Sequence, residues 1–98
     1  MKDDNLAFLE ALELVISDRI DNLSQDSYTA SLAAMGPRRV AQKVGEEGVE
    51  LAIACVDGTD DEVLNEAADL VYHVLVLLRL RSLGLADVAR VLEARHTG

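Results

Sequence analysis

The sequence predicts an all-α protein, a helical bundle with two long helices and two or three shorter ones. The chain is rich in Ala, Leu, Val and Glu, and it holds one Pro and only 3% aromatic residues. Apolar residues recur at helical spacing, and the repeated turn signals of an all-β protein are missing. At 98 residues the chain is expected to form one domain, residues 1–98.

The N-terminal third predicts two helices separated by a polar loop. The first is expected to begin after Asn5, as its N-cap, and to end near Asn22. One face of it is apolar, with Leu9, Leu12, Ile16, Ile20 and Leu23. The other face is acidic and expected to be solvated, with Glu10, Glu13, Asp18 and Asp21. After a loop at residues 22–26, Ser27 is expected to cap a short helix that ends near Ala34.

Two long helices follow and a short one closes the chain. The first long helix is expected from Pro37 to Val56, because Pro suits the first turn of a helix. The second is expected to run to about Ser82 from a capping box, Thr59-x-x-Glu62. Only residues 57–61 separate them, which predicts an antiparallel hairpin. The last helix is expected at residues 85–95.

The helix at residues 37–56 is apolar around most of its circumference. Val49, Ile53 and Val56 form one of its two apolar stripes. Between the stripes lies a narrow polar strip of Lys43, Glu46, Glu47 and Glu50, which we expect to be partly enclosed. Glycine destabilises the interior of a helix, so the presence of Gly45 and Gly48 indicates that another helix or a ligand approaches closely there. The alternative is that the helix simply tolerates both glycines. Cys55 lies in the apolar part and is expected to be a buried, structural thiol.

Two acidic pairs carry the functional signal. Glu47-x-x-Glu50 lies in one long helix and Glu66-x-x-Asp69 in the next, and residues three apart share a helix face. Four carboxylates among apolar residues repel one another unless a cation lies between them, and Mg²⁺ prefers oxygen ligands. A metal site and a merely solvated acidic seam both remain open at this point.

Other metal and phosphate sites fit poorly. A di-iron bundle requires Glu-x-x-His, but Asp69 follows Glu66 at that spacing. An EF-hand starting at Asp57 would place Ala68 where the bidentate Glu belongs. The sequence has no Gly-rich phosphate loop and no zinc-type Cys/His spacing. His73 follows Asp69 by one turn, and either supports the site, contacts substrate or lies in a helix interface.

Charge and hydropathy exclude two classes of partner. The formal net charge of −9 argues against nucleic acid, which requires a basic surface. No apolar run reaches the ~20 residues that span a bilayer, and no signal region follows the N-terminus. We expect a soluble, cytoplasmic protein. An anionic substrate would require a metal and local Lys or Arg side chains to reverse the field.

The acidic segments resemble a known family. Residues 42–51, QKVGEEGVEL, followed by residues 66–73, EAADLVYH, are similar to phosphoribosyl-ATP pyrophosphohydrolase, of the MazG-like all-α nucleoside triphosphate pyrophosphatases. The resemblance extends to residues 26–29 and 85–88. Gly48 and Ser31 depart from the family pattern, where Ala and Lys are expected, so the basic contact expected at position 31 is missing.

The resemblance implies a Mg²⁺-dependent hydrolysis of phosphoribosyl-ATP to phosphoribosyl-AMP and pyrophosphate, the second step of histidine biosynthesis. It implies that Glu47, Glu50, Glu66 and Asp69 hold the metal, with Glu47 and Glu46 as catalytic residues, Glu46 being an additional ligand or a base for water. The substrate-binding candidates are Lys43, Arg39, Tyr28, Thr29 and His73, together with Arg38. Lys43 has a simpler alternative role, an ion pair with Glu47.

Partners and rival functions complete the expectation. A homo-oligomer, at least a dimer, is expected because two short helices cannot cover two long, mostly apolar ones. Association with phosphoribosyl-AMP cyclohydrolase, fused to this domain in some relatives, is left open. Two rivals remain: a house-cleaning nucleoside triphosphate pyrophosphatase with the same metal motif, and a non-catalytic acidic helical binding module.

Overall fold

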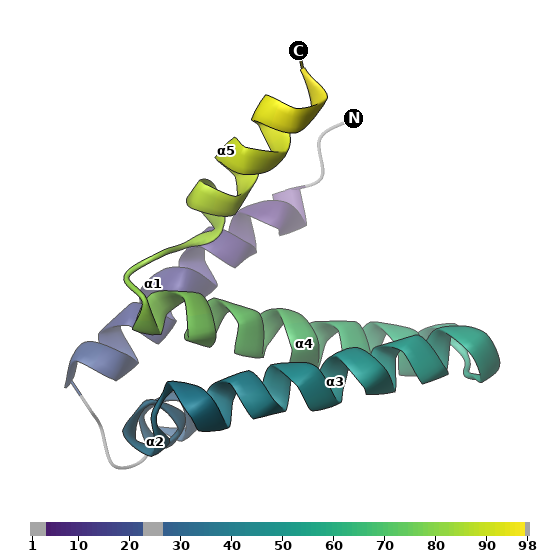
Figure 1. The fold of residues 1–98 in the computed structure, drawn as a ribbon, viewed down its shortest axis with the longest axis horizontal. Coiled ribbons are helices and arrows are strands. Elements are labelled where there is room, and N and C mark those ends of the chain that lie inside the picture. Colours follow the sequence, from purple (N-terminus) through teal and green to yellow (C-terminus); the bar gives the residue numbers. More distant parts are fainter. Residues whose placement is uncertain (1–3, 23–26, 98) are drawn as a thin grey trace.

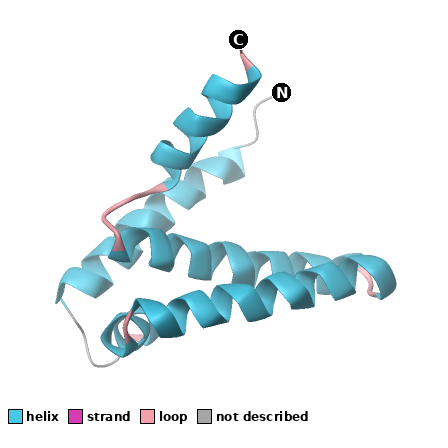
Figure 2. Ribbon diagram, viewed as in Figure 1, coloured by secondary structure: helices cyan, strands magenta, loops and turns pink. Residues whose placement is uncertain are grey.

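The chain is helical throughout the part that the structure describes. The structure is a computed structural model, and it describes residues 4–22 and 27–97. Over these residues Figure 2 shows helices joined by short loops, without a strand, which confirms the all-α prediction. The elements are η1 (Asp4–Leu6), α1 (Ala7–Asn22), α2 (Tyr28–Met35), α3 (Pro37–Asp57), α4 (Asp60–Leu80) and α5 (Leu85–His96).

The two long helices form the predicted antiparallel hairpin. Helices α3 and α4 lie side by side along their length and make the most extensive helix contact in the described chain (Figure 1). Helix α2 packs against α3 and α4, at the end of the hairpin that lies away from the α3–α4 turn. Helix α1 packs against α2 and α4, while α5 extends away from the hairpin beside α1. One long side of the hairpin is therefore left without a covering helix.

A small core joins the first four helices. It consists of Ile16 from α1, Leu32 from α2, Val40 from α3, and Leu75 with Val76 from α4. Each of these side chains is almost fully buried. The core lies where α1 and α2 reach the hairpin, so the other half of the hairpin is held mainly by contacts between its own two helices.

Local signals placed most helix ends correctly. The Ser27 side chain accepts a hydrogen bond from the Ala30 backbone N–H at 3.2 Å, and Pro37 is the first residue of α3. Gly36 separates the two helices with a φ of 93°, a conformation that side chains with a Cβ rarely adopt. At the start of α4 the predicted capping box is present. The Glu62 N–H donates to the Thr59 hydroxyl at 3.2 Å, and the Thr59 N–H donates to the Glu62 carboxylate at 3.1 Å.

Thr59→Ala is expected to lower the free energy of unfolding by about 1 kcal/mol at neutral pH, because it removes a side-chain cap. Two hydrogen bonds hold the pKa of the Glu62 carboxyl below its ordinary value: the larger effect comes from the Thr59 backbone N–H and the smaller from the Thr59 hydroxyl. Because the pKa is lowered in the folded state, these bonds stabilise the fold at pH values above the unfolded pKa of 4.5. This stabilisation is lost as the pH falls through the folded pKa. Denaturant titrations should therefore show the penalty shrinking in acid, whereas a constant penalty would contradict this account.

Two predicted boundaries require correction. Asn5 lies inside the 3₁₀ turn η1, so α1 begins at Ala7 rather than directly after an Asn5 cap. Helix α4 ends at Leu80, two residues before the predicted Ser82, which has a positive φ of 60° in the turn that follows. Most of the predicted polar loop, together with Leu23, lies outside the described residues.

Helix α3 is less covered than predicted. Cys55, expected to be a buried thiol, is exposed. Val49, Ile53 and Val56 are exposed as well. A Cβ at Gly45 or Gly48 would meet nothing within 4 Å, so no other part of the described chain approaches these glycines. These expectations fail for one reason: α3 packs against α4 on one side, and its opposite side faces none of the helices that the structure describes.

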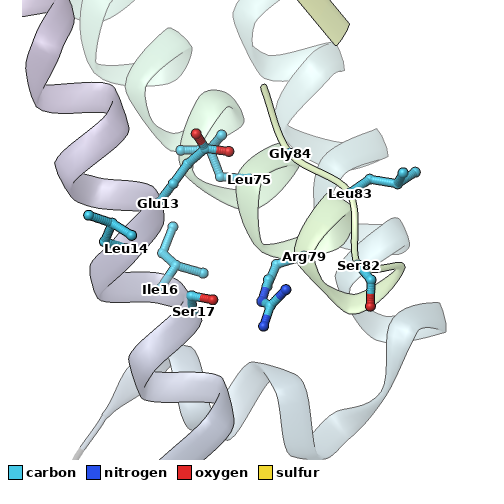
Figure 3. Close-up of a pocket in the computed structure, with 9 residues that line it drawn as sticks. All are labelled: Glu13, Leu14, Ile16, Ser17, Leu75, Arg79, Ser82, Leu83 and Gly84. Atoms are coloured by element: carbon cyan, nitrogen blue, oxygen red, sulfur yellow. The ribbon is translucent and has the colours of Figure 1, made fainter. Parts of the chain in front are cut away.

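The acidic pattern of α1 predicted that Glu13 lies on a solvated face, and this prediction is wrong. Its Oε2 accepts a hydrogen bond from the Leu85 backbone N–H at 2.8 Å, which ties the start of α5 to α1. A pocket of about 290 Å³ lies beside this bond, and Figure 3 shows Glu13 and Ile16 reaching from α1 toward Leu75 on α4. The remaining lining residues are Leu14, Ser17, Arg79, Ser82, Leu83 and Gly84.

Glu13→Ala is expected to destabilise the protein by about 1 kcal/mol, because it removes the acceptor of the Leu85 N–H. Hydrogen exchange should show faster opening at the start of α5. Glu13→Gln is the matched control, since its amide oxygen keeps an acceptor of the same reach. Equal losses in the two variants would show that the charge of Glu13, and not this hydrogen bond, stabilises the corner.

None of the described helices is both long and apolar enough to cross a membrane.

Candidate active site

The two acidic pairs meet between α3 and α4. Glu47 and Glu50 come from α3, and Glu66 and Asp69 come from α4. The charges of Glu50 and Asp69 raise the pKa of both Glu47 and Glu66, and that of Glu47 also raises the pKa of Glu66. Glu47 and Glu66 are partly buried, whereas Glu50 and Asp69 are exposed. The antiparallel hairpin thus brings the two pairs into one acidic cluster, here defined as these four residues.

Burial dominates at Glu47. Desolvation raises the pKa of this carboxyl above its ordinary value, and the charges of Asp69 and Glu50 add to the increase. The charges of His73 and Lys43 act in the opposite direction. Glu47 therefore lies in an acidic environment that two basic side chains relieve only in part.

Glu66 is governed by its carboxylate neighbours. A hydrogen bond with the Glu50 side chain is the largest cause that raises the pKa of Glu66, followed by burial and by the charges of Glu50, Asp69 and Glu47. Glu66 therefore lies in an acidic environment, and a cation close to it would offset the charges of the neighbouring carboxylates.

Two oxygens of the cluster are buried without a hydrogen bond, Glu47 Oε1 and Glu66 Oε2, although His73 Nδ1 lies 2.6 Å from the first of them. Such an arrangement disfavours folding unless another group satisfies the oxygens. Carboxylate oxygens are the ligands that Mg²⁺ prefers, so the donor set and these two atoms fit such an ion. In the described chain, however, no three His, Cys, Asp or Glu side chains are already gathered at a spacing that could hold a metal.

A shallow pocket lies beside the cluster. It measures about 240 Å³ and is lined by Glu50 and Ile53 with Ala54 from α3, and by Glu62 and Glu66 from α4. Two members of the acidic cluster therefore face a space that a small group can enter.

The predicted catalytic and basic residues fall into two groups. Lys43 is partly buried, and its charge lowers the pKa of Glu47, so it belongs beside the cluster. Glu46 is exposed, and its Oε2 accepts a hydrogen bond from the Gln42 side chain at 3.1 Å. Arg38 and Arg39 are exposed in the first turn of α3. Their predicted roles, and that of Glu46, stay predictions.

The other substrate-binding candidates form a polar network between α2 and α4. The Tyr28 hydroxyl lies 3.0 Å from His73 Nε2, and the Thr29 hydroxyl hydrogen-bonds to the Tyr72 hydroxyl. His73 and Thr29 are buried, whereas Tyr28 is 53% exposed. Tyr72 was missed in the sequence, because a Tyr in an apolar helix gives no signal of its own. The substrate-binding roles of Tyr28, Thr29 and His73 stay predictions.

Fold and site together define an all-α protein whose two long antiparallel helices hold a four-carboxylate cluster. The family model described as phosphoribosyl-ATP pyrophosphohydrolase matches residues 9–96. The chain belongs to this family, which confirms the resemblance found in the sequence.

Curated relatives agree. Histidine biosynthesis bifunctional protein HisIE of Xylella fastidiosa (strain Temecula1) is 57% identical over 89 residues, 91% of this chain and 43% of the relative. The HisIE protein of Xanthomonas axonopodis pv. citri is 53% identical over 89 residues, with the same coverage of both chains. That of Photobacterium profundum is 50% identical over 91 residues, 93% of this chain and 44% of the relative. The chain spans less than half the length of these relatives.

Proposed function

We propose that this chain hydrolyses phosphoribosyl-ATP to phosphoribosyl-AMP and pyrophosphate, the second step of histidine biosynthesis. The observation that carries the proposal is the acidic cluster between α3 and α4, with a buried carboxylate oxygen on each helix that makes no hydrogen bond. Family membership supplies the substrate. The two agree chemically, because a triphosphate and four carboxylates are all anionic and require a cation between them.

Mg²⁺ is the proposed cofactor, held by Glu47, Glu50, Glu66 and Asp69. Once bound, the ion would neutralise triphosphate oxygens and lower the pKa of a water molecule. The protein's own part is to hold the four carboxylates on two helices that the hairpin keeps in register. Glu46 is proposed to accept a proton from the attacking water or to add a ligand.

Basic and hydroxyl groups are proposed to bind the substrate. Lys43 lies beside the cluster, and its ammonium group would meet phosphate oxygens there. Arg39 and Arg38 are exposed at the start of α3, and they are proposed to bind a second phosphate. At the start of α2, Tyr28 is exposed and offers a hydroxyl and a ring face.

A homodimer is part of the proposal. Large apolar side chains remain exposed along the hairpin, and contiguous apolar surface of this kind is typical of interfaces. Those on α3 and α4 are Val49, Ile53, Val56, Leu64 and Val71. A groove of about 400 Å³ between α1 and α4 is lined almost entirely by apolar residues and continues this surface. Sedimentation that gives the mass of one chain at micromolar concentration would reject the dimer.

We further propose a cytoplasmic location and a functional link to phosphoribosyl-AMP cyclohydrolase. The relatives are named bifunctional, and this chain matches 43% of the Xylella fastidiosa protein, so a second activity fits the remainder. The cyclohydrolase would consume the phosphoribosyl-AMP that this chain releases.

Pyrophosphate release from phosphoribosyl-ATP, ATP and dCTP, each with and without Mg²⁺, tests the function. The expected result is metal-dependent release from phosphoribosyl-ATP at a kcat/KM far above that for the other two. A preference for dCTP or ATP would indicate a house-cleaning pyrophosphatase instead. No release from any of the three would indicate a non-catalytic module. Complementation of a histidine auxotroph that lacks only this step gives an independent readout.

A further inference from the structure

A chain of polar contacts leads from α2 to the acidic cluster through one buried imidazole. The Tyr28 hydroxyl lies 3.0 Å from His73 Nε2. On the other side of the ring, Nδ1 lies 2.8 Å from the Asp69 backbone oxygen and 2.6 Å from Glu47 Oε1. Only 5% of His73 is exposed. The ring therefore connects a residue on α2 with a carboxylate on α3, although it belongs to α4.

The neighbours of Nδ1 determine which ring nitrogen carries the proton. A carbonyl oxygen and a carboxylate oxygen are acceptors only, so Nδ1 must be the donor. Its N–H points at the Asp69 carbonyl, while Glu47 Oε1 lies close beside it without a hydrogen bond of its own. In the neutral ring Nε2 is then an acceptor, and the Tyr28 hydroxyl donates to it.

Aromatic packing holds the plane of the ring. Tyr72 meets the His73 ring edge to face, with ring centroids 5.2 Å apart and an interplanar angle of 89°. Tyr28 packs against it at 5.9 Å and 87°. Rotation of the imidazole would break the hydrogen bond from Tyr28, the hydrogen bond to Asp69 and both ring contacts. The ring thus presents a fixed N–H beside Glu47.

We propose that His73 is a positioning residue for the Glu47 carboxylate, and that the Tyr28 hydroxyl orients His73 for this task. The inference rests on the proposed function, because Glu47 is there a ligand of the metal. Groups behind a metal ligand hold its orientation, and their loss typically weakens metal affinity 10–100-fold. Helix α2 would thereby contribute to a site that lies between α3 and α4.

The same two helices offer a matched control. The Thr29 hydroxyl hydrogen-bonds to the Tyr72 hydroxyl. Thr29 is the neighbour of Tyr28 on α2, and Tyr72 is the neighbour of His73 on α4. In the described part of the chain, the hydroxyl and ring contacts of Tyr72 are with Thr29, Tyr28 and His73, whereas the contact with Glu47 comes from His73. Tyr72→Phe and Tyr28→Phe each remove one hydroxyl and keep the ring, so they weaken the α2–α4 contact alike. Only Tyr28→Phe releases the imidazole.

Mn²⁺ alone, measured by electron paramagnetic resonance with the intact chain, reports the effect without any turnover. Tyr28→Phe is expected to weaken Mn²⁺ affinity about 10-fold, within the range for a group behind a ligand. Tyr72→Phe is expected to change it less than about twofold. Tyr28 is exposed, so its variant should keep the wild-type helical circular dichroism.

A double-mutant cycle separates positioning from packing. His73→Asn keeps an amide N–H that can reach the Asp69 carbonyl but loses the nitrogen that Tyr28 contacts. In that background Tyr28→Phe is expected to have no further effect on Mn²⁺ affinity, because the partner of the hydroxyl is already gone. Additive losses would overturn the proposal, because Tyr28 would then act without His73.

The remaining outcomes are also decisive. Equal weakening by Tyr72→Phe and Tyr28→Phe would reduce the network to ordinary helix packing, and wild-type affinity in Tyr28→Phe would remove the role of the hydroxyl. Absence of Mn²⁺ binding in the wild-type protein would overturn this inference together with the metal site. If the expected Mn²⁺ pattern holds but phosphoribosyl-ATP is not hydrolysed, the proposed function fails and the positioning role stands.

Discussion

Glu47→Gln is expected to lower kcat/KM for phosphoribosyl-ATP by about 100-fold or more, because metal stabilisation of the reacting phosphate contributes several kcal/mol and each 1.36 kcal/mol is a factor of ten. Gln has the same shape but carries no charge, so the hairpin should remain folded. Mg²⁺ should raise the melting temperature of the wild-type protein, since a ligand that binds only the folded state stabilises it. The same addition should leave Glu47→Gln nearly unchanged.

Glu10→Gln is the control for this substitution. Glu10 is exposed on α1, outside the acidic cluster, so loss of its charge should leave both turnover and the Mg²⁺ response intact. A Glu47→Gln variant that keeps both properties would remove the acidic cluster from the mechanism. Asp69→Asn should behave like Glu47→Gln, because both carboxylates belong to the same cluster.

Leu32→Ala is expected to lower the free energy of unfolding by about 3 kcal/mol, a large part of the stability of a chain this small. Leu32 is 1% exposed and lies in the core that joins α2 to α1, α3 and α4. Truncation removes buried methyl groups and leaves a cavity that the surrounding helices close only in part. Urea unfolding followed by circular dichroism measures the loss.

Leu64→Ala makes the same chemical change at a site that is 66% exposed on α4. In the proposed dimer Leu64 is covered by the second chain, so its truncation should have an effect that grows with protein concentration. The loss in Leu32→Ala should not depend on concentration in this way. A loss below about 1 kcal/mol in Leu32→Ala would contradict the core described here.

The helices and their ends were readable from the sequence because the signals are local. Ser27, Pro37 and the Thr59 to Glu62 capping box act through hydrogen bonds or ring geometry within one turn of helix. Errors appeared where the deciding contact is distant. Glu13 looked solvated by its spacing, but its partner is the Leu85 N–H, 72 residues further along.

The candidate site divides in the same way. A spacing of three residues placed Glu47 with Glu50 and Glu66 with Asp69, and a short turn predicted that the two pairs would meet. Spacing also put Glu46 on the polar strip, yet its side chain turns to Gln42 on the exposed surface. For His73, the two contacts that define its orientation come from Tyr28 on α2 and Glu47 on α3.

Sequence by itself determined the all-α class, the hairpin of two long helices, the pairing of carboxylates on each helix, and the family. The first three depend on residues within a few turns of one another, so helical periodicity expresses them directly, whereas the family follows from the resemblance of residues 42–51 and 66–73. Tertiary structure alone decided which carboxylate oxygens are buried without a hydrogen bond, which side of α3 remains uncovered, and that His73 lies between Tyr28 and Glu47. Those features depend on how separate helices cross, and the packing of a whole core sets that geometry.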